Sequence, residues 1–397
     1  MIPVAEARER IASAFRPTGS ETIAIGEAAG RFLAEDARAR LGQPPAPVSS
    51  MDGYAVRAAD AAHIPATLRV IGSSPAGHPF AGNVGSGEAV RIFTGGVVPE
   101  GADSIVIQED TDSSGDTVIV KEAAKHGRHI RVAGLDFKSG DVLAPTGKRL
   151  TPRDLSLLAA GDLALITVRR KPRIAFVATG DELSRPGDAR KDGGIVASSG
   201  YGLGAMIARW GGEPVDLGIL PDTAEAVASI PTLAKNADLI VTLGGASVGD
   251  HDLIQRSLGP EGFTLDFWKI AMRPGKPLIF GSLRGTPLLG LPGNPVSTLV
   301  CALLFLKPAI AALLGAPFTE HLLAAKLETP LAANDKRQDY IRARTNVADG
   351  ILTVRPFAVQ DSSMLSILAE ADCLIVRAPH APEAKAGDMV QVLMLED

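Results

Sequence analysis

The sequence predicts an α/β multidomain protein, from its length, its alternation of strands and helices, and its turn chemistry. At 397 residues the chain is longer than one core usually supports, so we expect roughly two to four domains. After residue 173, β-like apolar runs alternate with helical stretches, which predicts a three-layer α/β domain with a mainly parallel sheet. Short β-like runs between Gly, Ser and Asp turns precede and follow that region. They predict a mostly-β unit and a C-terminal β-barrel or sandwich.

The first elements in chain order are a helix and a domain crossing. Residues 4–15 place apolar side chains at three-to-four-residue spacing, which predicts a helix. Residues 41–47 (LGQPPAP) cannot continue a helix or a central strand, so they mark the crossing. The mostly-β unit follows from about residue 48 to 132, with expected strands at 67–71, 104–107 and 117–120.

A short helix is predicted next, because Thr151 can cap it, Pro152 suits its first position and Gly161 ends it. In the α/β region we expect strands at 173–178, 238–243 and 287–291, and helices at 200–210, 224–235 and 296–306. After about residue 317 the helical period disappears, and the expected strands are 322–327, 340–347, 352–356, 373–376 and 389–395. The sequence Ala348-Asp349-Gly350 is a plausible hairpin turn between two of them.

Composition excludes several classes of protein. Hydrophobic residues make up 46% and charged residues 21%, which is typical of globular proteins rather than disordered ones. Aromatic residues make up only 4%, which argues against a protein that stacks on nucleic-acid bases. The formal charge is -5 and no Lys/Arg block is long enough to form a basic stripe. We therefore expect no nucleic-acid partner.

The cysteines and the apolar runs indicate the cellular compartment in which we expect the protein. Cys301 and Cys373 each lie in an apolar run without a Cys/His cluster, so we expect buried free thiols in a reducing compartment. The start of the chain lacks the pattern of a signal peptide. The longest apolar run, residues 296–314, is broken by Lys307-Pro308 and predicts a buried helix followed by a second short one. We expect a cytoplasmic protein without membrane partners.

Three glycine-turn loops follow apolar runs, at residues 179–183, 244–252 and 291–297. In an open α/β sheet such loops meet where parallel strands end, which is where ligands bind. The first loop carries Asp181 and Glu182, which suit either a metal or hydroxyl ligand or the start of a helix. The second carries Asp250 and Asp252, which point the same way if the segment is extended but are also common in turns.

The third loop offers a site for anions. Asn294 is a candidate N-cap and Pro295 a first helical residue, so the free N–H groups suit a phosphate or carboxylate, although an ordinary capped helix has the same pattern. Lys269, Arg273 and Lys276 surround Pro274-Gly275 and form either an anion clamp or a solvated loop. Acidic groups beside an anion site suggest a divalent cation between them. Asp52-Gly53, taken alone, is most often a hairpin turn.

Taken in order, these motifs and several others resemble the MoeA family of molybdopterin molybdenumtransferases, which includes the E domain of gephyrin. The resemblance covers essentially the whole chain. Individually the motifs are weak, but as an ordered set they are specific. They are SMDGYAV (50–56), FTG (93–95), PEGAD (99–103), GLDF (134–137), TGDEL (179–183), GGASVGDHD (244–252), PGKP (274–277) and PGNPVS (292–297).

The resemblance implies the last step of molybdenum cofactor biosynthesis: adenylylated molybdopterin is bound, molybdate is inserted and AMP is released in a Mg²⁺-dependent reaction. The alternatives are a molybdopterin adenylyltransferase, whose usual Gly-Gly-Thr-Gly loop is replaced by Gly-Gly-Ala-Ser at 244–247, and a non-catalytic scaffold of the same fold. The implied fold is an elongated homodimer whose subunits share the active site. Its expected domains are an N-terminal α+β linker domain (1–47 and 133–170), an inserted mostly-β domain (48–132), an α/β molybdopterin-binding domain (171–316) and a C-terminal β-barrel (317–397). A molybdopterin adenylyltransferase and molybdoenzymes are implied protein partners.

The resemblance also implies the site residues. The acidic active-site positions are Asp52, Asp136, Glu182, Asp222 and Asp252. Of these, Glu182, Asp222 and Asp252 are the expected Mg²⁺ ligands, and Asp52 would complete the site across the dimer interface. The expected substrate-binding residues are Thr94, Gly180, Asp181, Ser199, Gly244, Gly245, Ser247, Asp250, Lys269, Arg273, Lys276, Pro292, Gly293, Asn294, Ser297, Arg337, Arg342, Ser362 and Ser363. Ser199 stands where the family usually has Asn, and Arg337 and Arg342 match a C-terminal arginine motif only loosely.

Overall fold

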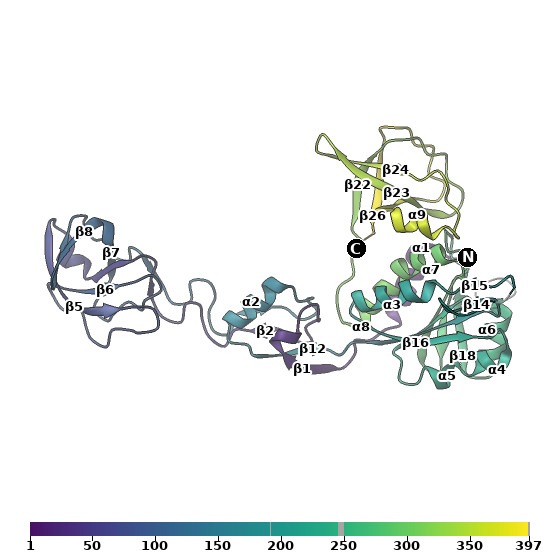
Figure 1. Ribbon diagram of the computed structural model, residues 1–397, viewed down its shortest axis with the longest axis horizontal. Helices are drawn as coiled ribbons and strands as arrows, with labels where there is room; N and C mark the ends of the chain where they lie inside the picture. The colour runs from purple at the N-terminus through teal and green to yellow at the C-terminus, as the bar shows by residue number, and fades with distance from the viewer. Residues whose placement is uncertain (191, 245–249, 396–397) are drawn as a thin grey trace. The chain divides into compact units, whose positions relative to one another are not determined.

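A computed structural model describes residues 1–190, 192–244 and 250–395, with only the backbone of residues 250–253. The chain forms two compact units (Figure 1). Unit 1 consists of Met1–Glu21, Gly30–Ala34 and Arg169–Asp397, and unit 2 of Thr22–Ala29 and Glu35–Val168. Both segments of unit 2 are therefore inserted into the chain of unit 1. The finer four-domain division stays a prediction.

Unit 1 is built on a six-stranded sheet in the order β16-β13-β17-β21-β20-β18. The first four of these strands are parallel, and β20 and β18 are antiparallel additions at one edge. This confirms the predicted mainly parallel sheet, but the sequence did not predict β18 or β20. The strand bounds are β13 (Arg173–Thr179), β16 (Glu213–Leu220), β17 (Leu239–Leu243), β18 (Phe263–Trp268), β20 (Ile279–Leu283) and β21 (Thr286–Leu291).

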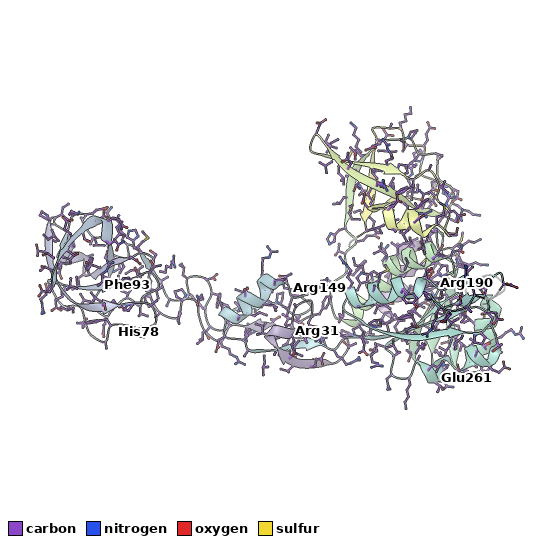
Figure 2. All side chains as sticks on the ribbon, viewed as in Figure 1. Arg31, His78, Phe93, Arg149, Arg190 and Glu261 are labelled. Atoms are coloured by element: carbon purple, nitrogen blue, oxygen red, sulfur yellow. The ribbon has the colours of Figure 1, made fainter. Side chains whose placement is uncertain are left out.

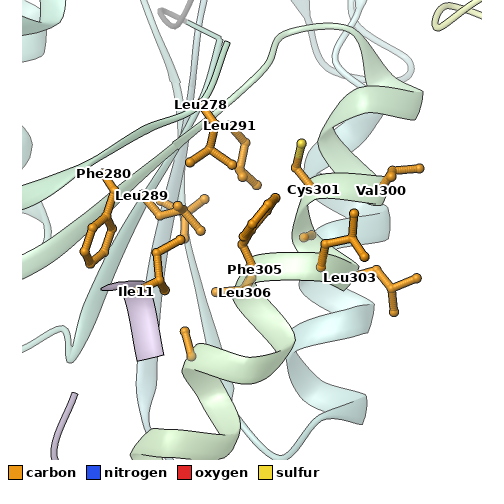
Figure 3. Close-up of a cluster of buried hydrophobic side chains, with 14 of the residues drawn as sticks. Ile11, Leu278, Phe280, Leu289, Leu291, Val300, Cys301, Leu303, Phe305 and Leu306 are labelled. Atoms are coloured by element: carbon orange, nitrogen blue, oxygen red, sulfur yellow. The ribbon is translucent and has the colours of Figure 1, made fainter. Parts of the chain in front are cut away.

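Helices cover both faces of this sheet. Successive residues of a strand point to opposite faces, so each strand contributes apolar side chains to both helical layers. Ile174 and Phe176 pack against one helical layer, and Ala175 and Val177 against the other. Figure 3 shows part of the larger core, which includes Ile11, Leu291 and Phe305. The predicted three-layer arrangement is thus confirmed. The first layer holds α1 (Val4–Ser13), α3 (Ser199–Arg209), α7 (Pro295–Cys301), the π-helical η4 (Ala302–Leu306) and α8 (Lys307–Leu313); the second holds α4 (Ala224–Ala228), α5 (Ile230–Leu233) and α6 (Asp250–Leu258).

Two helix predictions differ from the structure. Residues 224–235 were expected as one helix, but α4 ends before Ser229 and α5 starts anew with Pro231 in its first turn. A proline is disfavoured inside a helix and suited to a first turn, which accounts for the division. The segment Pro295–Leu313 is continuous, because the π-helical turn joins α7 to α8 where a break was expected. By length and composition it is the one helix of the described residues that could cross a membrane, and 78% of its most apolar 18-residue stretch is buried in the protein.

The C-terminal part of unit 1 is a closed five-stranded barrel, as predicted. The strands pair in the cycle β23-β24-β22-β26-β25-β23, and β19 (Met272–Arg273) adds to β23 from outside. Asp349 and Gly350 form the predicted hairpin turn, with φ of 52° and 76°. The bounds are β22 (Leu322–Leu327), β23 (Gln338–Ala348), β24 (Ile351–Pro356), β25 (Cys373–Arg377), β26 (Met389–Met394) and a helix, α9 (Leu365–Glu370), that was not predicted.

Unit 2 contains a second six-stranded sheet, in the order β7-β4-β6-β5-β9-β8. Its strands are β4 (Gly53–Val56), β5 (Ala66–Ser74), β6 (Glu88–Ile92), β7 (Ser104–Ile107), β8 (Thr111–Ser114) and β9 (Thr117–Val120). This confirms the mostly-β unit and its three predicted strands. The remaining elements are β1 (Ser20–Ala24), η1 (Ile25–Glu27), β2 (Ala37–Arg38), β3 (Val48–Ser49), η2 (Ala58–Ala61), η3 (Gln108–Asp110), β10 (Ile130–Arg131), β11 (Val142–Ala144), α2 (Pro152–Ala160) and β12 (Leu165–Arg169).

The helix of unit 2, α2, begins as predicted. The Thr151 hydroxyl accepts a hydrogen bond from the Asp154 N–H, and the Asp154 carboxylate accepts one from the Thr151 N–H at 2.8 Å. Lys148 Nζ donates to the other carboxylate oxygen of Asp154 at 2.6 Å. This capping box fixes the first turn of α2.

Candidate active site

A cavity of about 490 Å³ lies where the parallel strands β13, β17 and β21 end. Glu182 comes from the loop after β13, Asp222 from the loop after β16 and Gly244 from the end of β17. Pro292, Gly293, Asn294 and Ser297 come from the loop after β21 and the start of α7. These loops meet because parallel strands put their carboxyl ends on one edge of the sheet. Eight of the sequence-predicted site residues, these seven and Ser199 at the start of α3, therefore line one cavity.

The acidic loops after β13 and β16 contact each other. The Asp222 N–H donates to Asp181 Oδ1 at 3.4 Å, and the Gly180 N–H donates to the Leu220 carbonyl at 3.2 Å. Gly180 also leaves room for the Glu182 carboxylate, because a Cβ there would lie 2.7 Å from Glu182 Oε2. The two loops thus place the Glu182 and Asp222 side chains on the same cavity.

Two glycines let the other loops approach closely. Gly244 has a φ of 92°, and a Cβ on it would lie 3.1 Å from the Thr179 carbonyl oxygen. A Cβ on Gly293 would lie 3.6 Å from Gly244 Cα. Backbone therefore forms this wall of the cavity, which suits close contact with a ligand.

Asn294 takes the predicted N-cap position of α7 but not the predicted bond. Its Nδ2 donates to Ser362 Oγ at 2.9 Å, and no capping bond comes from its side chain. The Val296 N–H donates to the Ser362 carbonyl at 3.2 Å, and Pro295 has no N–H. The helix start therefore offers fewer free donors than the sequence predicted, because Ser362 of the barrel already occupies it. This contact ties the cavity to the C-terminal barrel.

The strands β14 (Leu183–Ser184) and β15 (Ile195–Val196) form a further side of the cavity, which the sequence patterns did not predict. Ile195 and Val196 line the cavity, yet they are 56% and 39% exposed. Exposed apolar side chains at a cavity suit contact with a ring system of a ligand. The β-branched pair directly after Gly193-Gly194 was the signal available in the sequence.

The predicted cation clamp does not assemble at this cavity. Lys269 Nζ lies 3.4 Å from the centre of the Trp268 ring, and its backbone φ is 71°. Arg273 forms an ion pair with Asp339, and both line a second cavity of about 490 Å³ beside the barrel. Lys276 is exposed, next to the cavity-lining Pro277. Only Lys276 of the three thus lies beside a residue of the first cavity.

The C-terminal arginines serve structural contacts. Arg342 is buried, with Nε donating to Gln360 Oε1 at 3.3 Å and Nη1 to the Met364 carbonyl at 3.3 Å. Arg337 pairs with Asp335 at 2.9 Å, and this hydrogen bonding lowers the pKa of Asp335 to about 2. Ser363 donates from its hydroxyl to Asp361 Oδ1 at 2.6 Å. None of these three residues lines the first cavity in the part of the chain that is described.

Part of the second glycine loop cannot be compared with its predictions. Gly245 and Ser247 lie outside the described residues, as do the side chains of Asp250 and Asp252. The backbone from Asp250 is helical, so the extended segment that was one of the two alternatives for the aspartates is not formed. Among the described residues, no three His, Cys, Asp or Glu side chains form a group that could hold a metal ion. The predicted metal set therefore stays a prediction.

The remaining acidic positions lie in unit 2. Asp52 is not in a hairpin turn: it lies at a bend between β3 and β4, which pair with different strands. Asp52 Oδ1 accepts hydrogen bonds from the Thr94 N–H at 2.7 Å and the Thr94 hydroxyl at 2.9 Å. These bonds, the N–H bond first, lower the pKa of Asp52. Asp136 is exposed, and its N–H donates to the Gln43 carbonyl at 2.9 Å.

Known proteins resemble this chain over its full length. Residues 2–161 match the MoeA N-terminal region (domain I and II), 175–312 the family described as "Probable molybdopterin binding domain", and 324–395 the MoeA C-terminal region (domain IV). A molybdopterin molybdenumtransferase from Haemophilus influenzae is 35% identical, covering 95% of this chain and 94% of the relative. One from Bacillus subtilis is 33% identical, covering 100% and 94%.

Solved structures agree with this comparison. A crystal structure of the molybdopterin biosynthesis MoeA protein from Pyrococcus horikoshii OT3 matches with a TM-score of 0.86 and 28% identity, covering 100% of both chains. With the three matched regions, the full-length relatives and this shared architecture, the chain belongs to the MoeA family of molybdopterin molybdenumtransferases.

Proposed function

We propose that this protein inserts molybdenum from molybdate into adenylylated molybdopterin and releases AMP, the last step of molybdenum cofactor biosynthesis. The observation that carries the proposal is family membership over the full chain, together with one cavity lined by Glu182, Asp222 and the start of α7. Acidic side chains and a closely approaching glycine backbone at the carboxyl ends of parallel strands suit a phosphorylated ligand held through a cation.

We propose Mg²⁺ as the cofactor, held by Glu182 and Asp222, with Asp252 as the third ligand implied by the family resemblance. Glu182 and Asp222 line one cavity, and carboxylate oxygens are the donors that Mg²⁺ prefers, so the residues fit the ion. When bound, the ion would neutralise phosphate charge beside the carboxylates. The chain's own contribution is to hold the substrate phosphates in a fixed orientation, through the close backbone of Gly244 and Gly293.

The remaining contacts follow from position. Ile195 and Val196 would cover the flat pterin, and Lys276 would attract the oxyanion. Ser199, Asn294 and Ser297 would supply polar contacts at the cavity wall.

We also propose a homodimer in which Asp52 and Asp136 of one subunit complete the site of the other. The hydrogen bonding of the Asp52 carboxylate supports this, because two bonds from Thr94 fix an acidic group that does not cap a hairpin turn. The adenylyltransferase of the preceding step and the enzymes that receive the cofactor are the proposed protein partners. A cytoplasmic location stays a prediction.

The test is AMP release by the purified protein given adenylylated molybdopterin, molybdate and Mg²⁺. We expect Glu182→Gln and Asp222→Asn to lower the rate at least about tenfold, because each removes a charged ligand of the ion. Both should also raise the Mg²⁺ concentration that gives half-maximal rate. Glu213→Gln is the matched control: Glu213 lies at the opposite end of β16 and pairs with Arg173, so the rate should not change.

The outcomes separate the hypotheses. AMP release that requires molybdate and falls in both cavity variants supports insertion. A wild-type protein that binds the nucleotide but releases no AMP with any oxyanion contradicts the proposal and leaves a scaffold of the same fold. Equal rates in Glu182→Gln and wild type at limiting Mg²⁺ would show that Glu182 is not a ligand of the metal ion.

A further inference from the structure

Arg91 of unit 2 lies against two aromatic rings beside the Asp52 bend. Its guanidinium carbon is 5.1 Å from the centre of the Tyr54 ring and 4.9 Å from that of Phe93. Tyr54 is directly opposite Arg91 in the β4–β6 register, and Phe93 is two residues after Arg91, so both rings reach the same face of the sheet. Figure 2 labels Phe93 in this unit. The rings hold the guanidinium in one place through cation–π contacts.

The same guanidinium is hydrogen-bonded to the chain around Asp52. Nη1 donates to the Gly53 carbonyl at 3.1 Å, and Nη2 donates to Gln108 Oε1 at 2.6 Å. The Gln108 N–H in turn donates to the Asp52 carbonyl at 3.0 Å. The carbonyls of both Asp52 and Gly53 are therefore fixed by Arg91 or its direct partner.

The backbone of Gly53 lies tightly against β7. A Cβ on Gly53 would lie 2.0 Å from the Val106 carbonyl oxygen, so β4 packs against β7 without any side chain between them. Thr94, which binds the Asp52 carboxylate, follows Arg91 by only three residues. Arg91 thus lies at the junction of the two segments whose relative position sets the Asp52 side chain.

We propose that Arg91 is a positioning residue that holds the Asp52 bend in register with Thr94. Both Thr94 bonds reach Oδ1, and among the described residues no hydrogen bond reaches Oδ2, which is left for a ligand. The inference rests on the proposed function, in which Asp52 completes the site of the partner subunit. A lysine cannot replace Arg91, because it lacks the planar fork that stacks on rings and donates in two directions.

Hydrogen exchange of the full-length protein tests the positioning directly, without an activity readout. In Arg91→Ala and Arg91→Lys, the Thr94 amide should exchange at least about fivefold faster than in wild type, because its acceptor is no longer held. Peptides from β8 and β9, which do not pair with β6, should not change. Arg69→Ala is the control, since Arg69 pairs with Glu88 in the same sheet without contacting the Asp52 bend. Unchanged exchange at Thr94 in a folded Arg91 variant overturns the inference.

A coupling experiment then tests the link to the reaction. Arg91→Lys should lower kcat for AMP release by about ten- to a hundredfold in the wild-type background, as displacement of a site group does. In the Asp52→Asn background it should have no further effect, because Arg91 acts through Asp52. An equal loss in both backgrounds, or wild-type kcat in Arg91→Lys, overturns the inference. If wild type releases no AMP, the proposed function fails, and the exchange result still decides the positioning role.

Discussion

Asp154 in the capping box of α2 gives a stability prediction whose sign and size follow from the structure. Burial of this carboxyl acts to raise its pKa, but hydrogen bonds from Lys148 and Thr151 outweigh burial and lower the pKa to about 2. Relative to the ordinary aspartate pKa of 3.8, this lowering corresponds to about 2 kcal/mol. Lys148 is 39% exposed, so solvent screening reduces the expected contribution to about 1–2 kcal/mol.

The direction with pH is fixed by the lowered pKa. A carboxyl whose pKa is lower in the folded than in the unfolded protein stabilises the folded state. This stabilisation is fully present above the pKa of the unfolded state, near 4. That contribution decreases as the pH falls from about 4 toward 2, where the folded carboxyl also takes up a proton. Asp154→Asn should therefore destabilise α2 at pH 7 and have progressively less effect below pH 4.

The measurement is amide hydrogen exchange of α2 (residues 152–160), corrected for the intrinsic rate at each pH. At pH 7 the Asp154→Asn variant should exchange roughly 5 to 30 times faster than wild type, which corresponds to the energy above. Asp116→Asn, an exposed aspartate in the same unit, is the matched control and should leave α2 unchanged. A difference between Asp154→Asn and wild type that stays constant from pH 7 to pH 3 would refute the charge-based explanation.

Three further predictions concern unit 1. Gly275 has a φ of 105°, and a Cβ there would lie 2.3 Å from Cys301 Sγ. Gly275→Ala should therefore lower the free energy of unfolding, measured in urea, by about 2–4 kcal/mol. Adding Cys301→Ala should restore part of this loss, because it removes the sulfur that the new Cβ meets. Ser362→Ala removes the acceptor of Asn294 Nδ2 and should lower stability by about 1 kcal/mol while raising KM for the nucleotide substrate, whereas unchanged KM would place the contact outside binding. Burial raises the pKa of both free thiols, that of Cys373 to about 12, so a thiol reagent at pH 8 should label neither until denaturant is added; labelling of the native protein would contradict the burial.

Local patterns in the sequence predicted most of the layers and strands. The hairpin at Asp349-Gly350 and the capped start of α2 depend on residues within a few positions of each other, so they were predictable. The strands β18 and β20 were missed because they form an antiparallel edge that the alternation of parallel strands does not require. Tertiary contacts decide such additions.

The site was predictable as a set of loops but not in its contacts. The carboxyl ends of parallel strands lie at one edge of the sheet whatever their side chains are, so the predicted strand ends indicated where Glu182 and Asp222 would meet. The bond from Asn294 to Ser362 joins residues 68 positions apart, and no local pattern signals that choice over a capping bond. Arg342 likewise reads as an anion ligand in sequence, but it is 1% exposed and bonded to the barrel.

Unit 1 is formed from both ends of the chain, and this affects how it can fold while the ribosome is still synthesising it. Val4, Ala7 and Ile11 of α1 are buried in the same core as α8, which is encoded about three hundred residues later, and Arg8 pairs with Glu320 at 2.9 Å. All of unit 2 leaves the ribosome before α8 exists, so unit 2 can fold early while the apolar face of α1 still lacks its partner. A nascent chain that stops before residue 300 therefore leaves the apolar face of α1 exposed. Chaperones or proteases that bind exposed apolar surface would then recognise the incomplete chain.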